Sequence, residues 1–391
     1  MIADSMTLAV ALLGIAAGVY AASSLSSLGW LFRYFPPVVW MYFVPMLLST
    51  AGVLPAEHPL YASLARYALP MALILLTVST DLRAVASVGV SALLSLAIGA
   101  LGVGAGCVLA YLLFSPWLGD DAWQAFAMLS ATWIGGSANM VAMQQSLGVP
   151  ASYIGPIVVV DTVIAYSWLG LLIAVAAQQP FLNRFLNADM SRLDSVEAQL
   201  RESSAHAKPA TVNSICMILG FSLVGSFLAR VLAENLPELG SPRIITATTW
   251  TILITVSLGL LLSGSRLGQL ARQHRASEYA YAALFLLLVS VGAQADLRAV
   301  GEAPVFLFAG ALVLLVHVAC LLLACRLLRL PAFFVAVGSM ANVGGAVSGP
   351  IAASAYRPAL APVGALLGVA GYILGIYLPL GIAFVLSVFA S

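Results

Sequence analysis

Long runs of apolar residues alternate with short polar breaks along almost the whole chain. A membrane-spanning helix needs about 20 apolar residues, and the runs approach that length repeatedly. The pattern predicts twelve candidate segments, near residues 6–23, 37–54, 62–80, 88–114, 122–147, 151–177, 211–233, 245–264, 278–295, 303–325, 331–352 and 361–389. One long polar stretch, from about Asn183 to Pro209, separates the first six segments from the last six.

The two halves carry the same short motifs at matching positions. The third segment of each half is followed by Asp-Leu-Arg-Ala-Val, at residues 81–85 and 296–300. About fifty residues later each half has a glycine pair inside an apolar segment, Gly135-Gly136 and Gly344-Gly345. The match in motif and in order indicates an internal repeat. We predict an N-terminal membrane repeat over residues 1–180, a cytoplasmic linker over 181–210 and a C-terminal membrane repeat over 211–391.

The composition agrees with a chain embedded in lipid. Hydrophobic residues make up 62% of the 391 and charged residues 8%, whereas soluble domains carry about 25% charged residues. The 16 basic and 15 acidic residues nearly cancel, which argues against a nucleic-acid partner. The sequence therefore predicts an all-α polytopic membrane protein, with membrane lipid as its surroundings.

The glycine pairs predict helices that are broken or re-entrant inside the membrane. Glycine permits an unwound backbone, but an unpaired backbone group costs several kcal/mol in hydrocarbon. Unwinding therefore persists where a cavity or a ligand supplies partners, as at the midplane sites of two-repeat transporters. The alternative is close packing of helices through small residues. Hydroxyl and carboxamide side chains near the glycines favour a binding site, and these are Thr132, Ser137, Asn139, Gln144, Asn342 and Ser348.

Asp161 is the acidic residue that lies near the middle of an apolar segment, in the run GPIVVVDTVIAYSW. A charge there costs about 2.5–3.5 kcal/mol on insertion scales, so a functional role is expected, with a structural hydrogen bond or ion pair as the alternative. No basic residue lies as deep within a segment, which favours a bound Na⁺ or H⁺. We predict a Na⁺ site at Asp161, Asn139, Asn342 and Ser348, with Thr162 beside it.

The sequence contains no motif that indicates an enzyme. The nucleophile motif GxSxG, the zinc motif HExxH and the Walker phosphate loop are all missing. His317, in the run VLLVHVACLL, is predicted to be a hydrogen-bonded core residue. We expect no enzymatic activity and no cofactor, with Na⁺ or H⁺ as the coupling ion.

The charge distribution leaves the number of membrane crossings open. If segments five and eleven are re-entrant, each half crosses five times and the halves are inverted. If all twelve segments cross, the halves point the same way. The positive-inside rule places eleven of the 16 basic residues inside in the first case and ten in the second, and this difference does not decide between them.

Two windows of the sequence resemble the YjcL-like family of uncharacterised membrane proteins (domain of unknown function 819). They are residues 131–173, beginning ATWIGGSANM, and the stretch Ala341 to Gly345. The layout is also similar to that of the more distant sodium–glutamate symporters and cation/proton antiporters. The resemblance implies two inverted repeats, a core domain that moves against a scaffold domain, and a homodimer. The family motif corresponds here to Gly135, Gly136, Ser137, Asn139 and Asp161, and to Asn342, Gly344 and Gly345.

These features favour a Na⁺-coupled symporter in the bacterial inner (plasma) membrane. Its partner would be a small organic anion, an amino acid or a carboxylate, carried by alternating access. The alternative is a Na⁺/H⁺ antiporter with no organic substrate. An intramembrane enzyme or a receptor is disfavoured, because the chain shows neither a nucleophile–base pair nor a soluble signalling domain.

Overall fold

The protein is described from a computed structural model, which describes residues 4–34, 37–191, 193, 211–240, 244–295 and 303–390. Within these residues the chain forms α-helices and short 3-10 helices joined by loops, with one isolated β-bridge between Leu239 and Ile245. The predicted all-α class is confirmed. The second Asp-Leu-Arg-Ala-Val motif, at residues 296–300, and residues 194–210 of the predicted linker lie outside the described residues.

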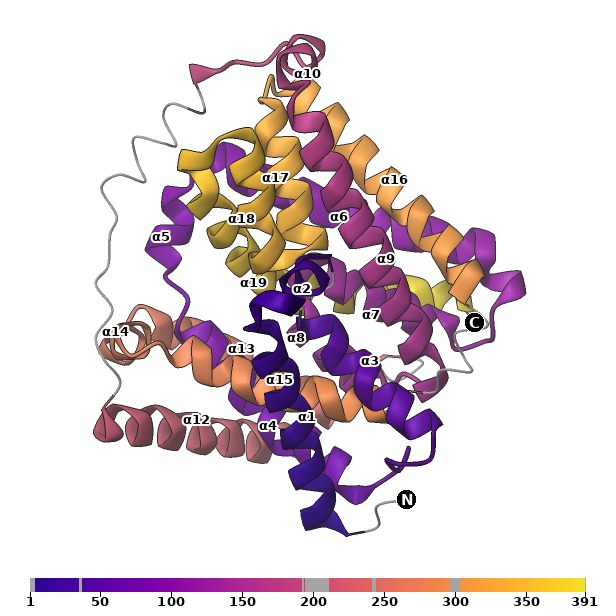
Figure 1. Ribbon diagram of the computed structural model, residues 1–391, viewed down its shortest axis with the longest axis vertical. Helices are drawn as coiled ribbons and strands as arrows, with labels where there is room; N and C mark the ends of the chain where they lie inside the picture. The colour runs from indigo at the N-terminus through magenta and orange to yellow at the C-terminus, as the bar shows by residue number, and fades with distance from the viewer. Residues whose placement is uncertain are drawn as a thin grey trace. The chain divides into compact units, whose positions relative to one another are not determined.

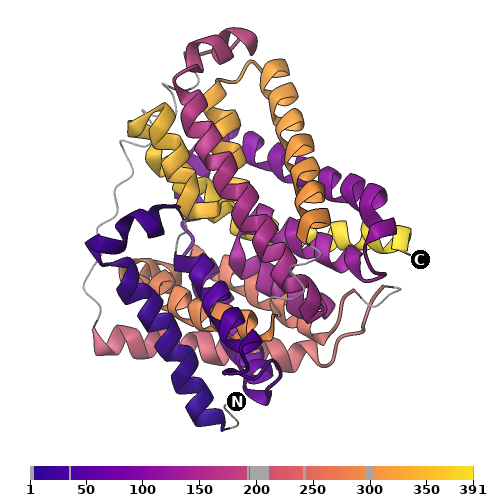
Figure 2. The same cartoon turned by 45° about the vertical axis from the view of Figure 1, so that its right-hand side comes forward.

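Eight helices in the described part are long and apolar enough to cross a membrane. They are α1 (Ser5–Ser23), α4 (Pro59–Val78), α6 (Val90–Phe114), α9 (Ala151–Ala176), α12 (Val212–Ala233), α15 (Ala276–Gln294), α16 (Ala303–Leu327) and α19 (Ala361–Ala390). A ninth span is formed if α13 (Ala247–Ser263) and α14 (Arg266–Gln273) are counted together, although they meet at an angle of 91°. The protein is therefore an integral membrane protein. Figure 2 shows one of these long helices, α16, as a single unbroken helix.

The three remaining predicted segments form shorter helices. The first is α3 (Pro37–Thr50), which has 14 residues. Residues 122–147 form α7 (Ala122–Gly135) and α8 (Ser137–Leu147), and residues 331–352 fall in α17 (Ala332–Val343) and α18 (Gly345–Tyr356). Both predicted glycine breaks are confirmed.

The helices form two compact units, and each unit takes elements from both halves of the chain. Unit 1 contains Met1–Ser79, Gln144–Thr162 and Lys208–Phe306, and Unit 2 contains Thr80–Met143, Val163–Ala207 and Leu307–Ser391. The short helices of Unit 1 are η1 (Ser26–Leu28) and α2 (Gly29–Tyr34), and those of Unit 2 are α5 (Leu82–Ser87), η2 (Ser115–Trp117), α10 (Gln179–Phe185) and η4 (Pro358–Leu360). The division into repeats at residues 1–180 and 211–391 follows chain order and stays a prediction.

Unit 1 shows the same helix contacts in both halves. By their order in the two halves, α1, α3 and α4 correspond to α12, α13 and α15. α3 packs against α15, and its counterpart α13 packs against α4. In the same way α1 packs against α3 and α15, while α12 packs against α13 and α4 (Figure 1). α4 and α15, the third segments of the two halves, pack against each other. Each contact made by a helix of one half therefore has an equivalent contact made by the corresponding helix of the other half. This pattern is expected for repeats related by a two-fold axis.

Unit 2 is organised around α19. This helix packs against α6, α7, α17 and α18, so one continuous helix contacts both broken pairs. α17 also packs against α6 and α7. An apolar core that includes Leu96, Phe333, Phe334 and Leu367 joins α6, α17 and α19. The α17–α18 break is therefore held by a core to which α6 and α19 also contribute.

Two acidic side chains mark helix starts. The Asp81 carboxylate, the first residue of the Asp-Leu-Arg-Ala-Val motif, accepts hydrogen bonds of 3.0 Å from the N–H groups of Arg83 and Ala84 at the start of α5. Asp4 accepts a 2.8 Å bond from the Thr7 N–H at the start of α1, and this bond lowers the pKa of the Asp4 carboxyl. Both carboxylates satisfy N–H groups that have no partner within the helix.

We predict that Gly292→Ala disrupts the contact between α15 and α3. A Cβ at Gly292 would lie 2.8 Å from the Cα of Tyr42, so the helices would have to separate. Such overpacking costs about 1–3 kcal/mol of unfolding free energy. Gly220→Ala in α12 is the matched control, because nothing lies within 4 Å of a Cβ there. Equal thermal unfolding of the two variants in detergent would contradict the close contact.

Candidate functional site

The first break is made by backbone angles that favour glycine. α7 ends at Gly135, and Gly136 has φ +77° and ψ −176° before α8 begins at Ser137. The Gly136 N–H donates a 2.7 Å bond to the Thr132 carbonyl, which closes the last turn of α7. A positive φ is strained for residues with a Cβ but not for glycine. Gly136 can therefore adopt the backbone angles that end α7 and allow α8 to begin.

The second break has a similar form. α17 ends at Val343, the Gly344 N–H donates a 2.9 Å bond to the Met340 carbonyl, and Gly345 has φ +63°. Ser348 is buried in the first turns of α18, where a Cβ at Gly344 would lie 2.8 Å from its hydroxyl oxygen. Glycine at position 344 thus leaves room for the Ser348 side chain.

The ends of α7 and α17 approach the same point on α19. A Cβ at Gly371 would lie 2.7 Å from the carbonyl oxygen of Ile134 and 3.5 Å from that of Ala341. These carbonyls belong to last turns, where the break removes the usual N–H donors. Among the described residues, neither oxygen accepts a hydrogen bond from a backbone N–H that lies outside its own helix. The two short helices therefore direct their partial negative charge toward Gly371.

A row of glycines on α19 permits this approach. Gly364, Gly368, Gly371 and Gly375 follow one another at steps of four, three and four residues, which places them on one face of the helix. A Cβ at Gly364 would collide with the Gly349 backbone, one at Gly368 with Ala346, and one at Gly375 with Gly135. The row thus contacts both broken pairs.

Asn139 ties the first break to α19. Its side chain is buried in α8, and its Nδ2 donates a 2.9 Å hydrogen bond to the carbonyl of Tyr372. The same Nδ2 fills the space where a Cβ at Gly135 or Gly375 would stand. The Asn139 carboxamide thus occupies the space that side chains at positions 135 and 375 would need.

Asn342 leaves one oxygen without a partner. Its Nδ2 donates to the carbonyls of Leu96 in α6 and Gly338 in α17, at 3.0 and 3.1 Å. Its Oδ1 is buried and accepts no hydrogen bond from any residue that the structure describes. Burying such an acceptor unsatisfied costs about 1–3 kcal/mol. This oxygen lies two residues before the break, so it is a candidate ligand atom at the site.

The predicted site residues are divided between the two units. Unit 2 holds Thr132, Gly135, Gly136, Ser137, Asn139, Asn342, Gly344, Gly345 and Ser348, and Unit 1 holds Gln144, Asp161 and Thr162. Within Unit 2, Thr132 is buried and Ser137 half-buried at the first break. The structure thus brings together the two glycine motifs.

In Unit 1, Asp161 and Thr162 are half-buried near the middle of α9. The Asp161 carboxylate interacts electrostatically with the hydroxyl of Tyr42 in α3. That hydroxyl is buried and has no hydrogen-bond partner among the described residues, and the same is true of the Gln144 Oε1. Sequence reasoning missed Tyr42, because an interaction between residues about 120 positions apart leaves no local signal.

Comparison with known proteins agrees with a polytopic helical chain. Residues 11–389 match the model of DUF819, described as a protein of unknown function. The chain belongs to the DUF819 family. The uncharacterized membrane protein YjcL of Bacillus subtilis (strain 168) is 26% identical over 341 residues, which cover 85% of each chain. The family resemblance expected from the motif windows is confirmed.

This DUF819 chain also contains a buried hydrogen-bond network around His317. Its Nδ1 lies 2.8 Å from the Gly99 carbonyl oxygen of α6, and its Nε2 lies 2.9 Å from the Ser339 hydroxyl of α17. The indole N–H of Trp168 donates to the same hydroxyl at 2.8 Å. His317 is thus a hydrogen-bonded core residue, as predicted, and the network joins four helices beside Asn342.

We predict that Ser339→Ala destabilises the protein by about 1–3 kcal/mol, because it removes a shared partner of His317 and Trp168. Ser130→Ala is the matched control, since the buried Ser130 hydroxyl donates to the Ala127 carbonyl of its own helix. Thermal unfolding in detergent measures both. The network would have no structural role if the two variants melted alike.

Proposed function

We propose that this protein is a secondary active transporter that couples Na⁺ to the movement of a small organic anion. The observation that carries the proposal is the buried, unpartnered Oδ1 of Asn342 at the α17–α18 break. An oxygen in this state is a suitable ligand for a hard cation, because it gains a partner without losing another. Carbonyls at half-helix ends are also typical ligands for coupling ions in transporters.

The neighbouring groups support a cation at this break. The carbonyl oxygens of Ile134 and Ala341 approach Gly371, and Ser348 is buried at the start of α18. These are oxygen ligands, as alkali and alkaline-earth cations prefer. Within the described residues, no group of three or more His, Cys, Asp or Glu side chains could hold a metal ion. The donor set therefore suits Na⁺ better than a transition metal.

The other ends of the breaks suit an anion. α8 and α18 begin at Ser137 and Gly345, directly after Gly136 and Gly344, and a glycine has no side chain to cap a helix. The N-terminus of a helix carries partial positive charge and unpaired N–H groups. A carboxylate substrate could accept hydrogen bonds from these groups, as in other transporters with broken helices. We therefore infer an amino acid or carboxylate as the substrate class.

Asp161 is the proposed coupling carboxylate in Unit 1. It lies in mid-helix, interacts with Tyr42, and belongs to a long apolar helix. Two compact units, each with helices from both halves, suit an alternating-access cycle in which one unit moves against the other. The exchange pattern in Unit 1 supports inverted repeats. Location in the bacterial inner membrane, a homodimeric state and the lack of enzymatic activity belong to the same proposal.

A Na⁺/H⁺ antiporter is the second candidate function. A single membrane carboxylate such as Asp161 can bind Na⁺ and H⁺ in turn, and such a protein needs no organic substrate. The two functions differ in one measurement. An antiporter in sealed proteoliposomes changes the internal pH when Na⁺ is added alone, whereas a symporter requires the organic anion.

We predict that Na⁺ stabilises the wild-type protein against heat more than K⁺ does at equal ionic strength. Bound ligand stabilises the folded state by RT ln(1 + [L]/Kd), or about 2.7 kcal/mol at 100 times Kd. Asn342→Ala should weaken Na⁺ binding about tenfold, because it removes one ligand. Asn235→Ala is the control, since Asn235 is an exposed residue beyond α12. A Na⁺ shift of the same size in Asn342→Ala would exclude Asn342 as a ligand.

Asp161→Asn should reduce Na⁺-driven uptake of the anion into proteoliposomes at least about tenfold, because an amide can neither balance the ion's charge nor release a proton. Asp121→Asn, an exposed residue before α7, is the control for the same chemical change. Uptake of labelled amino acids and carboxylates is followed with and without a Na⁺ gradient. Undiminished uptake by Asp161→Asn would refute the coupling role.

A further inference from the structure

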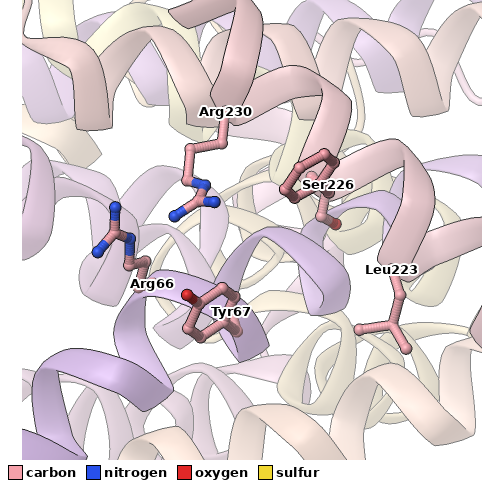
Figure 3. A pocket seen from close by; sticks show the side chains of 6 residues that line it. Arg66, Tyr67, Leu223, Ser226 and Arg230 are labelled. Carbon is pink, nitrogen blue, oxygen red and sulfur yellow. The ribbon is translucent and has the colours of Figure 1, made fainter. Parts of the chain in front are cut away.

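Two arginines face each other in a pocket between α4 and α12, away from the helix breaks. The pocket is small and partly open to its surroundings, and it is lined by Arg66, Tyr67, Leu223, Ser226, Phe227 and Arg230. Figure 3 shows both guanidinium groups directed into the same space beside the Tyr67 ring. All of these residues belong to Unit 1, so the pocket is defined within one compact unit.

The arginines lie near one end of the two helices. Arg66 is the eighth residue of α4, and Arg230 is in the last turn of α12. The helices run antiparallel, because Arg66 lies near Glu234 just after α12, while Ile74 meets Gly225 further along. Arginine heads near the end of a spanning helix are expected at the level of lipid headgroups.

Glu234 is an acidic neighbour of both guanidinium groups, at ion-pair distance but beyond hydrogen-bond distance. Glu234 lies 3.7 Å from Arg66 and 4.0 Å from Arg230, which exceeds the usual hydrogen-bond length of about 2.7–3.2 Å. The Arg230 Nε is buried and has no hydrogen-bond partner among the described residues. Two positive charges against one negative charge leave the cluster with a net charge of +1. An additional anion would balance this charge and offer a hydrogen-bond acceptor to the Arg230 Nε.

The aromatic rings fix the guanidinium groups in place. Arg230 lies over the rings of Tyr67 and Phe227, at 5.4 and 5.5 Å, and Arg66 lies 6.0 Å from the Tyr67 ring. Stacking of this kind restricts the long side chains while their N–H edges stay available. Planar guanidinium edges match the oxygens of a phosphate group, with two parallel hydrogen bonds to each group.

The apolar side of the pocket indicates that the phosphate belongs to a lipid. Leu223 and Phe227 are 51% and 54% exposed on α12, a helix that is long and apolar enough to span a membrane. Exposed apolar side chains on such a helix face acyl chains, which a free phosphate does not have. Basic pockets between membrane helices bind phospholipid headgroups for these reasons.

We propose that the Arg66–Arg230 pocket binds the phosphate group of an anionic phospholipid, with an acyl chain along Leu223 and Phe227. The site is independent of the proposed transport function. Glu234 competes with the lipid for the two guanidinium groups, so its charge weakens binding.

The test uses delipidated full-length protein in a neutral detergent, with phosphatidylglycerol or phosphatidylcholine added. Binding is measured by native mass spectrometry and by the shift in melting temperature. We expect phosphatidylglycerol to bind the wild type more tightly than phosphatidylcholine. Arg230→Gln should weaken phosphatidylglycerol binding roughly five- to tenfold, and Glu234→Gln should strengthen it. Arg275→Gln is the control and should leave binding unchanged, since Arg275 pairs with Glu278 outside the pocket.

Three results would overturn the proposal. Equal binding of the two lipids by the wild type would show that the pocket does not select anionic headgroups. An equal loss in Arg275→Gln and Arg230→Gln would show only a general effect of charge. Full saturation of the effect by inorganic phosphate would identify a free anion as the ligand. Because Glu234→Gln is expected to gain affinity, poor folding of Arg230→Gln would still leave a decisive measurement.

Discussion

A backbone carbonyl that loses its helical partner inside an apolar medium must find another partner or be shielded at a cost of several kcal/mol. In this protein the constraint acts where α7 and α17 end against α19. Glycines on α19 let the two helix ends come close to a continuous helix, with Ile134 and Ala341 presenting their carbonyls near Gly371. The broken helices, the polar side chains beside them and the proposed ion site all depend on this close approach.

The two asparagines at the breaks serve both structure and chemistry. Each uses its amide nitrogen to hold helices together, Asn139 through Tyr372 and Asn342 through α6 and its own helix. The unpartnered oxygen of Asn342 then remains for a ligand. In the neighbouring network, both ring nitrogens of His317 lie within hydrogen-bond distance of a partner. The network therefore stiffens the helices around the Asn342 oxygen.

Charge has two different uses in the chain. Asp161, in mid-helix, interacts with a buried tyrosine hydroxyl, where the apolar surroundings make any change of charge consequential. Arg66 and Arg230 lie near helix ends, stacked on aromatic rings, where lipid headgroups can supply the missing anion. The first arrangement suits a site that changes its occupant during a cycle, and the second suits a permanent contact with the bilayer.

The sequence by itself determined the all-α membrane class, the two Gly-Gly breaks and the placement of Asn139 and Asn342 beside them. It could do so because segment length, glycine and isolated polar residues act locally in an apolar chain. Only the tertiary structure decided that the Asn342 Oδ1 is left unpartnered, that Asp161 interacts electrostatically with Tyr42, and that Arg66 and Arg230 line one pocket. Those outcomes depend on contacts between residues far apart in the chain, and no periodicity or local motif encodes such contacts.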